Sequence, residues 1–160
     1  MNRLMKNLLI ILMMTAFSLG QLIGQVIEER SGIYYGENSK PYSGIYKEYY
    51  DNGQLQMKIN LSDGIFDGIS KVYHPNGVLN EQRSYRKGKM HGNWITWNDK
   101  GQKIAEANYF DGKKEGKWYV WNEHGTLLYD MTYSNGVRSG VWKMFDDSGN
   151  LMMEKNHNGK

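Results

Sequence analysis

The chain has 160 residues, no cysteine and 19 glycines, and 13% of its residues are aromatic. Its formal net charge is +3, but Arg3 and Lys6 lie in an acid-free leader, so the remainder holds 18 of the 20 basic residues against all 17 acidic residues. This near-neutral body lacks the electrostatic footprint of a nucleic-acid-binding protein, and the absence of cysteine excludes disulfides and cysteine-bound zinc.

Residues 1–20 are typical of a secretory signal peptide. Arg3 and Lys6 form a basic start, an apolar stretch follows over residues 8–19, and Gly20 is a small residue at a suitable cleavage point. We therefore expect a signal helix that is removed, and export to the bacterial periplasm or the extracellular space. The alternative is a membrane anchor formed by uncleaved residues 7–27. Its uninterrupted apolar stretch of about 12 residues is shorter than the roughly 20 needed to span a bilayer.

Residues 21–43 form a lead-in with an incomplete N-terminal repeat. The segment from Lys40 to Gly44 resembles later segments such as residues 64–68. Pro41 lacks a backbone N–H and belongs at a sheet edge or a turn. A polar, atypical first unit is what the cap of a repeat array requires.

From Gly44 onward the chain repeats every 24 residues. The period predicts five units, at residues 44–67, 68–91, 92–115, 116–139 and 140–160. Each unit has a leading glycine, a first-turn glycine and, except in the last unit, a second-turn glycine. The leading glycines are Gly44, Gly68, Gly92, Gly116 and Gly140. The first-turn glycines are Gly53, Gly77, Gly101, Gly125 and Gly149. The second-turn glycines are Gly64, Gly88, Gly112 and Gly136.

The turns divide each unit into two strands. Asn-Gly and Asp-Gly pairs predict two-residue hairpin loops, because a type I′ turn requires φ > 0 at both positions. We expect such a turn at Asn52–Gly53 and again at Asp111–Gly112. The predicted fold is therefore all-β, an elongated antiparallel β-meander of about ten strands in stacked hairpins, with no helix beyond the leader.

Turn register assigns the side chains to two faces. A two-residue loop at Asn52–Gly53 places Tyr50 opposite Leu55, Glu48 opposite Met57, and Tyr46 opposite Ile59, and opposed residues share a face. On this basis one face is a core face, which in the fourth unit holds Trp118, Val120, Leu127, Tyr129, Met131 and Tyr133. A one-residue bulge in a turn would exchange the faces.

The other face is mostly polar, with one aromatic exception. A ladder of rings, one per unit, crosses it: Tyr49, Tyr73, Trp97, Trp121 and Phe145. Exposed aromatics in a row mark interaction sites, so the ladder is the candidate binding surface, with Trp97 and Trp121 as its anchors. The alternative is that the ladder packs against Ile104, Leu128 and Met152 as structural support.

The units resemble MORN-type repeats, and they look closest to the bacterial variant in YwqK-family antitoxin proteins. The resemblance rests on Gly92, Trp94, Trp97 and Gly101, then on Tyr109, Gly112 and Gly116, with their counterparts in the other units. It covers residues 32–160. It implies stacked antiparallel hairpins that bind or scaffold other molecules rather than catalyse. The second unit departs most from the pattern, because Ser70 replaces the first aromatic.

No metal or cofactor site is expected. His74 and His124 lie on the same turn edge but four strands apart, roughly 19 Å, which is too far for a shared zinc ion. His91 lies on the opposite edge, and with His157 these residues are interpreted as solvated turn histidines. Aspartates in the turns are interpreted as turn formers, since no calcium-binding repeat pattern is present.

No catalytic residues are expected either. The chain has no cysteine nucleophile and no serine in a nucleophile elbow. Glu106 and Asp130 could supply a carboxylate pair, but their column also holds Lys58 and Gln82 and therefore does not demand acids.

Two function classes therefore remain. The first is a protein-interaction scaffold that docks through a sheet face or edge, a geometry that also allows a homodimer. The second is a carbohydrate or cell-envelope binder, because repeated Trp and Tyr with interleaved Asn and Asp also resemble choline- and glucan-binding repeats. Membrane lipid ranks third as a ligand, since a near-neutral body is poorly suited to anionic lipid.

Overall fold

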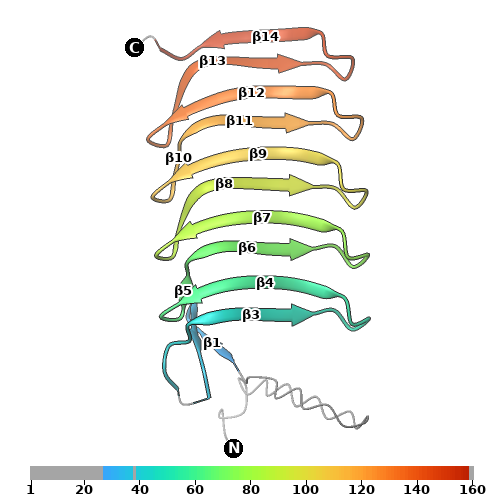
Figure 1. Cartoon of the computed structure of the whole chain (residues 1–160). Coiled ribbons are helices and arrows are strands. Elements are labelled where there is room, and N and C mark those ends of the chain that lie inside the picture. The colour runs from blue at the N-terminus through green and yellow to red at the C-terminus, as the bar shows by residue number, and fades with distance from the viewer. Residues whose placement is uncertain (1–26, 38, 159–160) are drawn as a thin grey trace, which may run out of the picture.

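The computed structural model describes residues 27–37 and 39–158. The expected signal peptide at residues 1–20, and nearly all of the alternative anchor at residues 7–27, lie outside these ranges. The described chain is an all-β antiparallel meander, as the sequence predicts (Figure 1). Within it, no helix has the length and apolar character needed to cross a membrane.

The strands form one long sheet and one small hairpin. The hairpin consists of β1 (Glu28–Arg30) and β2 (Ile33–Tyr35). The long sheet has ten strands in sequence order along its axis. They are β3 (Gly44–Tyr49), β4 (Leu55–Ser62), β6 (Gly68–Tyr73), β7 (Leu79–Arg86), β8 (Lys89–Trp97), β9 (Lys103–Phe110), β11 (Gly116–Trp121), β12 (Leu127–Ser134), β13 (Val137–Phe145) and β14 (Leu151–Asn156). Two short pieces, β5 (Ile65–Phe66) and β10 (Lys113–Lys114), pair with β4 and β9.

The first turn of each unit has a three-residue loop, so the expected two-residue loop is wrong there. The N–H of Gly53 donates to the carbonyl of Tyr50, and the N–H of Tyr50 donates to the carbonyl of Gln54, both at 2.9 Å. Only Gly53 has positive φ in this loop, while Asn52 does not. A type I turn followed by a left-handed glycine produces this arrangement, together with a bulge in the ladder.

The bulge changes the register next to the turn and leaves it intact farther along. Tyr46 pairs with Ile59 and Glu48 with Met57, as predicted, but Leu55 lies opposite Tyr49 instead of Tyr50. By the same shift Leu127 lies opposite Trp121. The assignment of Leu127 to the face of Trp118 and Met131 is therefore wrong. We call the face with Trp118 and Met131 the first face, and the face with the ladder the second face.

The second turns are the type I′ loops that the sequence predicts. Asp111 and Gly112 have φ of 47° and 83°, and they connect the paired residues Phe110 and Lys113. Asp-Gly and Asn-Gly tolerate φ > 0 at both loop positions. Lys87, which precedes Gly88, adopts φ of 49° in the same role.

Leading glycines create a second irregularity in each unit. Gly92 has φ of 90°, and a Cβ there would come within 3.4 Å of the Ser84 side chain. The strands after the second turns therefore bend, and asparagines fill the gap in two units. Where the third unit meets the fourth, the side-chain amide of Asn108 donates to the carbonyl of Lys117 (2.7 Å), and the N–H of Glu115 donates to the carbonyl of Asn108 (2.9 Å).

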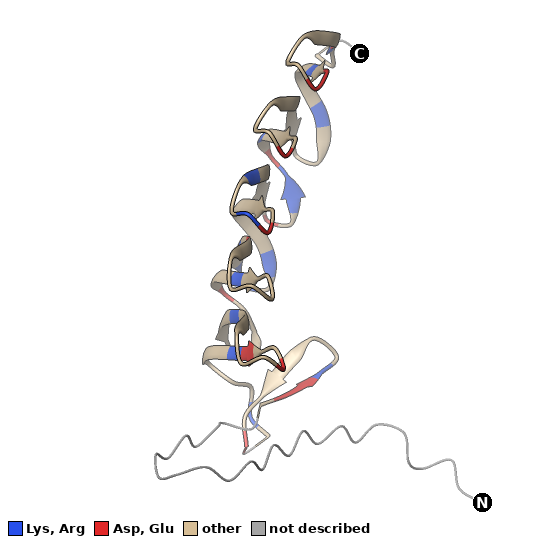
Figure 2. Cartoon of the chain, turned by 90° about the vertical axis from the view of Figure 1, so that its right-hand side faces the viewer, with Lys and Arg blue, Asp and Glu red and all other residues tan. Residues whose placement is uncertain are grey.

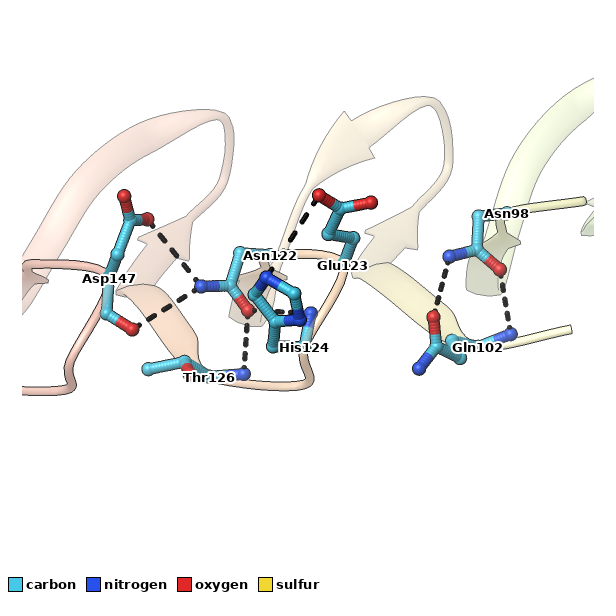
Figure 3. A network of polar contacts seen from close by, with 7 residues as sticks. All are labelled: Asn98, Gln102, Asn122, Glu123, His124, Thr126 and Asp147. Atoms are coloured by element: carbon cyan, nitrogen blue, oxygen red, sulfur yellow. Dashed lines mark hydrogen bonds and ion pairs between the residues drawn. The ribbon is translucent and has the colours of Figure 1, made fainter. Parts of the chain in front are cut away.

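Polar side chains stack the first turns of neighbouring units on one another (Figure 3). The side-chain oxygen of Asn122 accepts from the backbone N–H groups of His124 and Thr126, at 3.0 and 2.9 Å. Its amide nitrogen lies 3.5 Å from both the backbone and the side-chain oxygen of Asp147 in the next unit. Asn122 therefore stabilises its own turn and also contacts the turn of the next unit.

The long sheet is a single layer covered only at its N-terminal end. Figure 2 views it along the strands, as a column of stacked turns with the β1–β2 hairpin leaning out at the lower end. Among the described side chains only Ile59, Leu61 and Ser70 are buried. All three lie in the first units, beneath the lead-in, whose Tyr34 ring contacts Tyr46 at 5.4 Å. The first face is thus a covered core only there, which corrects the expectation of a core face along the whole array.

Candidate binding faces of the sheet

The ladder on the second face is neither buried nor fully exposed. Tyr49 is 57% exposed, and Tyr73, Trp97, Trp121 and Phe145 are half-buried. The register places Lys103 opposite Trp97, Leu127 opposite Trp121, and Leu151 opposite Phe145. Aliphatic and lysine side chains thus support the rings from the neighbouring strand, and part of each ring still meets solvent.

Two contacts hold Trp121 in place. The Tyr119 ring lies 5.5 Å from it, and the Lys103 ammonium group lies 4.5 Å from its centroid. A cation over an indole face is attracted by the ring quadrupole. The side chain is therefore oriented while it remains accessible, which is a suitable state for an anchor of binding.

A longer aromatic row, which was not among the sites expected from the sequence, crosses the first face. Ring centroids of successive members are between 4.9 and 5.7 Å apart. The members are Trp94, Tyr109, Trp118, Tyr133, Trp142 and His157. All of them are half-buried. The 24-residue columns of Trp and Tyr already indicated this row. These residues were expected to be buried in a core, so their partial exposure was not predicted.

Cations cover this aromatic row. Lys114 lies 4.3 Å from the Trp118 centroid and 4.8 Å from that of Tyr133, and Arg138 lies 4.8 Å from Trp142. Arg83 lies 4.7 Å from Trp94 and also pairs with Glu81. Long basic side chains that lie over rings shield apolar surface from water. Basic side chains of the first face therefore cover part of the aromatic rings on the same face.

The four histidines differ in how far their side chains are buried. The interpretation as solvated turn residues holds only for His124, which is exposed. His74 is half-buried, and its Nε2 lies 3.1 Å from the carbonyl of Trp97. His91 packs on Phe110 at 5.0 Å. Desolvation, with Lys155 and Arg138 nearby, lowers the pKa of His157. Among residues 27–37 and 39–158, no three His, Cys, Asp or Glu side chains are grouped as metal ligands would be.

Arg86 makes a charged contact between units at the second-turn edge. Arg86 pairs with Asp111 of the next unit at 2.7 Å, and this hydrogen bond holds the pKa of the Asp111 carboxyl below its usual value. Both side chains are about half exposed. A pair so open to solvent contributes little to stability and serves mainly to align neighbouring turns.

Four stretches of the chain match the MORN repeat variant family, at residues 42–63, 66–87, 114–135 and 138–158. Together they make up more than half of the 160 residues. The chain belongs to the MORN repeat variant family. No curated protein matches it. The MORN unit with Ser70 is among the matches, whereas residues 88–113 lie between them, so the expectation that the second unit departs most from the pattern is wrong. The β8–β9 hairpin nonetheless repeats the pairing of the other units.

Proposed function

We propose that this MORN repeat protein is a non-catalytic binding module that holds a protein partner on its sheet. The observation that carries the proposal is the single sheet layer, in which only Ile59, Leu61 and Ser70 of the described side chains are buried. A sheet with so small a core leaves apolar side chains available on both faces, and such surfaces are used for docking.

The ladder on the second face is the surface we assign to the partner, with Trp97 and Trp121 as anchors. Both rings are half-buried, so a partner would desolvate them without first having to pull them out of a core. Tryptophan is enriched among the residues that dominate binding energy at interfaces.

The test is affinity capture followed by a measured dissociation constant for the captured protein. The double variant Trp97→Ser with Trp121→Ser should fold and lose the partner. Tyr129→Ser is the matched control, because Tyr129 is an aromatic residue 39% exposed on the first face, and it should keep the partner. Full retention of binding by a folded double variant would contradict the assignment of the ladder.

Carbohydrate is the alternative ligand, since rings in a row beside asparagine side chains also suit sugars. Binding to a glycan array without any captured protein would favour it. We also propose export, on the strength of the signal-like residues 1–20, and the mass of the mature protein would reveal cleavage after Gly20. An exported protein would not meet a cytosolic toxin, so an antitoxin role of the YwqK kind is the less favoured form of protein binding.

A further inference from the structure

Three lysines lie side by side on the second face, across three adjacent strands. Lys47 of β3 is paired with Lys58 of β4, and Lys58 is paired with Lys71 of β6. Lys47 is exposed and the other two are half-buried. Within the described chain none of the three has an ion-pair partner. Like charges directly opposite one another destabilise a sheet, so this lysine row has an energetic cost.

The same face neutralises its charges in the later units. Lys103 pairs with Glu106 at 2.8 Å, and Lys117 pairs with Asp130 at 2.6 Å. Lys143 lies 3.6 Å from Glu154. The uncompensated charge is therefore confined to the first two units, and an anionic group from outside the chain would relieve the repulsion there.

Apolar side chains border the lysine row on both sides, and three of the four are exposed. Two residues along the strand toward the first turns lie Tyr49, which is 57% exposed, and Tyr73, the first two rings of the ladder. In the other direction lie Ile45 and Ile69, which are 48% and 46% exposed. A ligand that crosses the strands here would meet apolar contacts beside each cation.

The spacing of the array identifies a conformation for this ligand. Equivalent residues of successive units, such as Lys47 and Lys71, are two strands apart, about 9.6 Å. A polyproline II segment has three residues per turn and advances about 9.3 Å per turn. Every third residue of such a segment would therefore face an equivalent position of the next unit. An extended β-strand repeats every two residues, at about 6.8 Å, and does not match.

We propose that the lysine row and the adjoining rings Tyr49 and Tyr73 bind an acidic protein segment in polyproline II conformation, with a carboxylate at every third residue. Successive carboxylates would lie over Lys47 and Lys71, with Lys58 between them. The intervening prolines would lie over the tyrosines, as prolines dock on aromatic surfaces in other domains. The inference rests on the proposed protein-binding function and specifies the chemistry of the partner.

The test measures binding of a labelled synthetic peptide of repeated Glu-Pro-Pro triplets to the full chain by fluorescence anisotropy. Binding should weaken as salt rises. The triple variant Lys47→Gln, Lys58→Gln and Lys71→Gln should bind roughly tenfold more weakly, because its ion pairs with the carboxylates of the peptide would be lost and each such exposed pair is weak. Lys143→Gln, which removes a lysine already paired on the same face, should leave binding unchanged. The triple variant should also melt at a higher temperature than the parent, which serves as its folding control.

Two results would overturn the proposal. One is equal binding of a Gln-Pro-Pro peptide, because the carboxylates would then be irrelevant. The other is binding of an acidic oligosaccharide in place of the peptide. If a protein partner is captured through Trp97 and Trp121 while the triple variant binds it as well as the parent does, the proposed function stands and this inference fails.

Discussion

Single residues in the turns determine the geometry of each unit. Gly125 has φ of 82°, and a Cβ at this position would meet no atom within 4 Å. A substitution there is therefore penalised by the backbone conformation and not by packing. Asn122 complements the glycine, since its side chain accepts the N–H groups of two residues within the same loop.

Replacing Gly125 by Val should therefore lower the free energy of unfolding by about 1–3 kcal/mol, the cost of a strained left-handed residue. Gly125→Asn is the control, because asparagine tolerates this region and should cost less. Denaturant unfolding of both variants gives the comparison. Equal losses would indicate that backbone strain is not the cause.

The sequence predicted which residues form turns, but not the loop length in the first turns. Asn-Gly suits a type I′ loop, and it also suits a type I turn followed by a left-handed glycine. Nothing local separates the two. The difference of one residue moved Leu127 to the second face, while pairs farther from the turn, such as Tyr46 with Ile59, kept the predicted register.

Among the elements, the lead-in hairpin β1–β2 differs most from the repeats. It crosses the end of the long sheet, where the N–H of Tyr34 donates to the carbonyl of Gly64 at 2.9 Å. The contact is so close that a Cβ on Gly64 would lie 2.6 Å from the Ile33 side chain. Tyr34 also packs edge-on against Phe66 at 5.9 Å. The hairpin thus covers the buried residues of the first units.

Replacing Tyr34 by Ala should therefore loosen the N-terminal end of the array selectively. Loss of a half-buried ring costs about 1–3 kcal/mol. Hydrogen exchange should accelerate at Ile59 and Leu61, while amides of β11 and β12 should change little. Uniform acceleration along the sheet would show that the array unfolds as one unit instead.

The sequence did not reveal how much of the first face is covered by other parts of the chain. Alternation of Trp118, Val120 and Met131 identifies a shared apolar face, but periodicity carries no information on what lies over it. The structure supplies a lead-in over Tyr46 and Phe66, and leaves cations such as Lys114 over the later rings. Such cation–ring contacts depend on rotamers that strand spacing does not fix.

At the scale of the whole molecule, successive MORN units are joined through neighbouring strands and through their turns. Asn52 donates to the carbonyl of Pro75 at 3.0 Å, and Asn76 donates to that of Asp99 at 2.8 Å. The same bond therefore recurs at the first two junctions between units. Stability in such an array is approximately a sum of unit and neighbour terms, so its length is adjustable in whole periods.

Deletion of residues 92–115, one complete period, should accordingly leave a folded protein. The deletion joins His91 to Gly116, and Gly116 then takes the position of Gly92, with positive φ in both cases. Trp118 would take the place of Trp94 beside Arg83. The contact between Arg83 and the Trp94 ring would then be replaced by an equivalent contact with the Trp118 ring. Circular dichroism should retain a β spectrum, and the denaturant dependence of unfolding should fall in proportion to the surface lost. Loss of all β signal in the shortened chain would show that the units are not interchangeable.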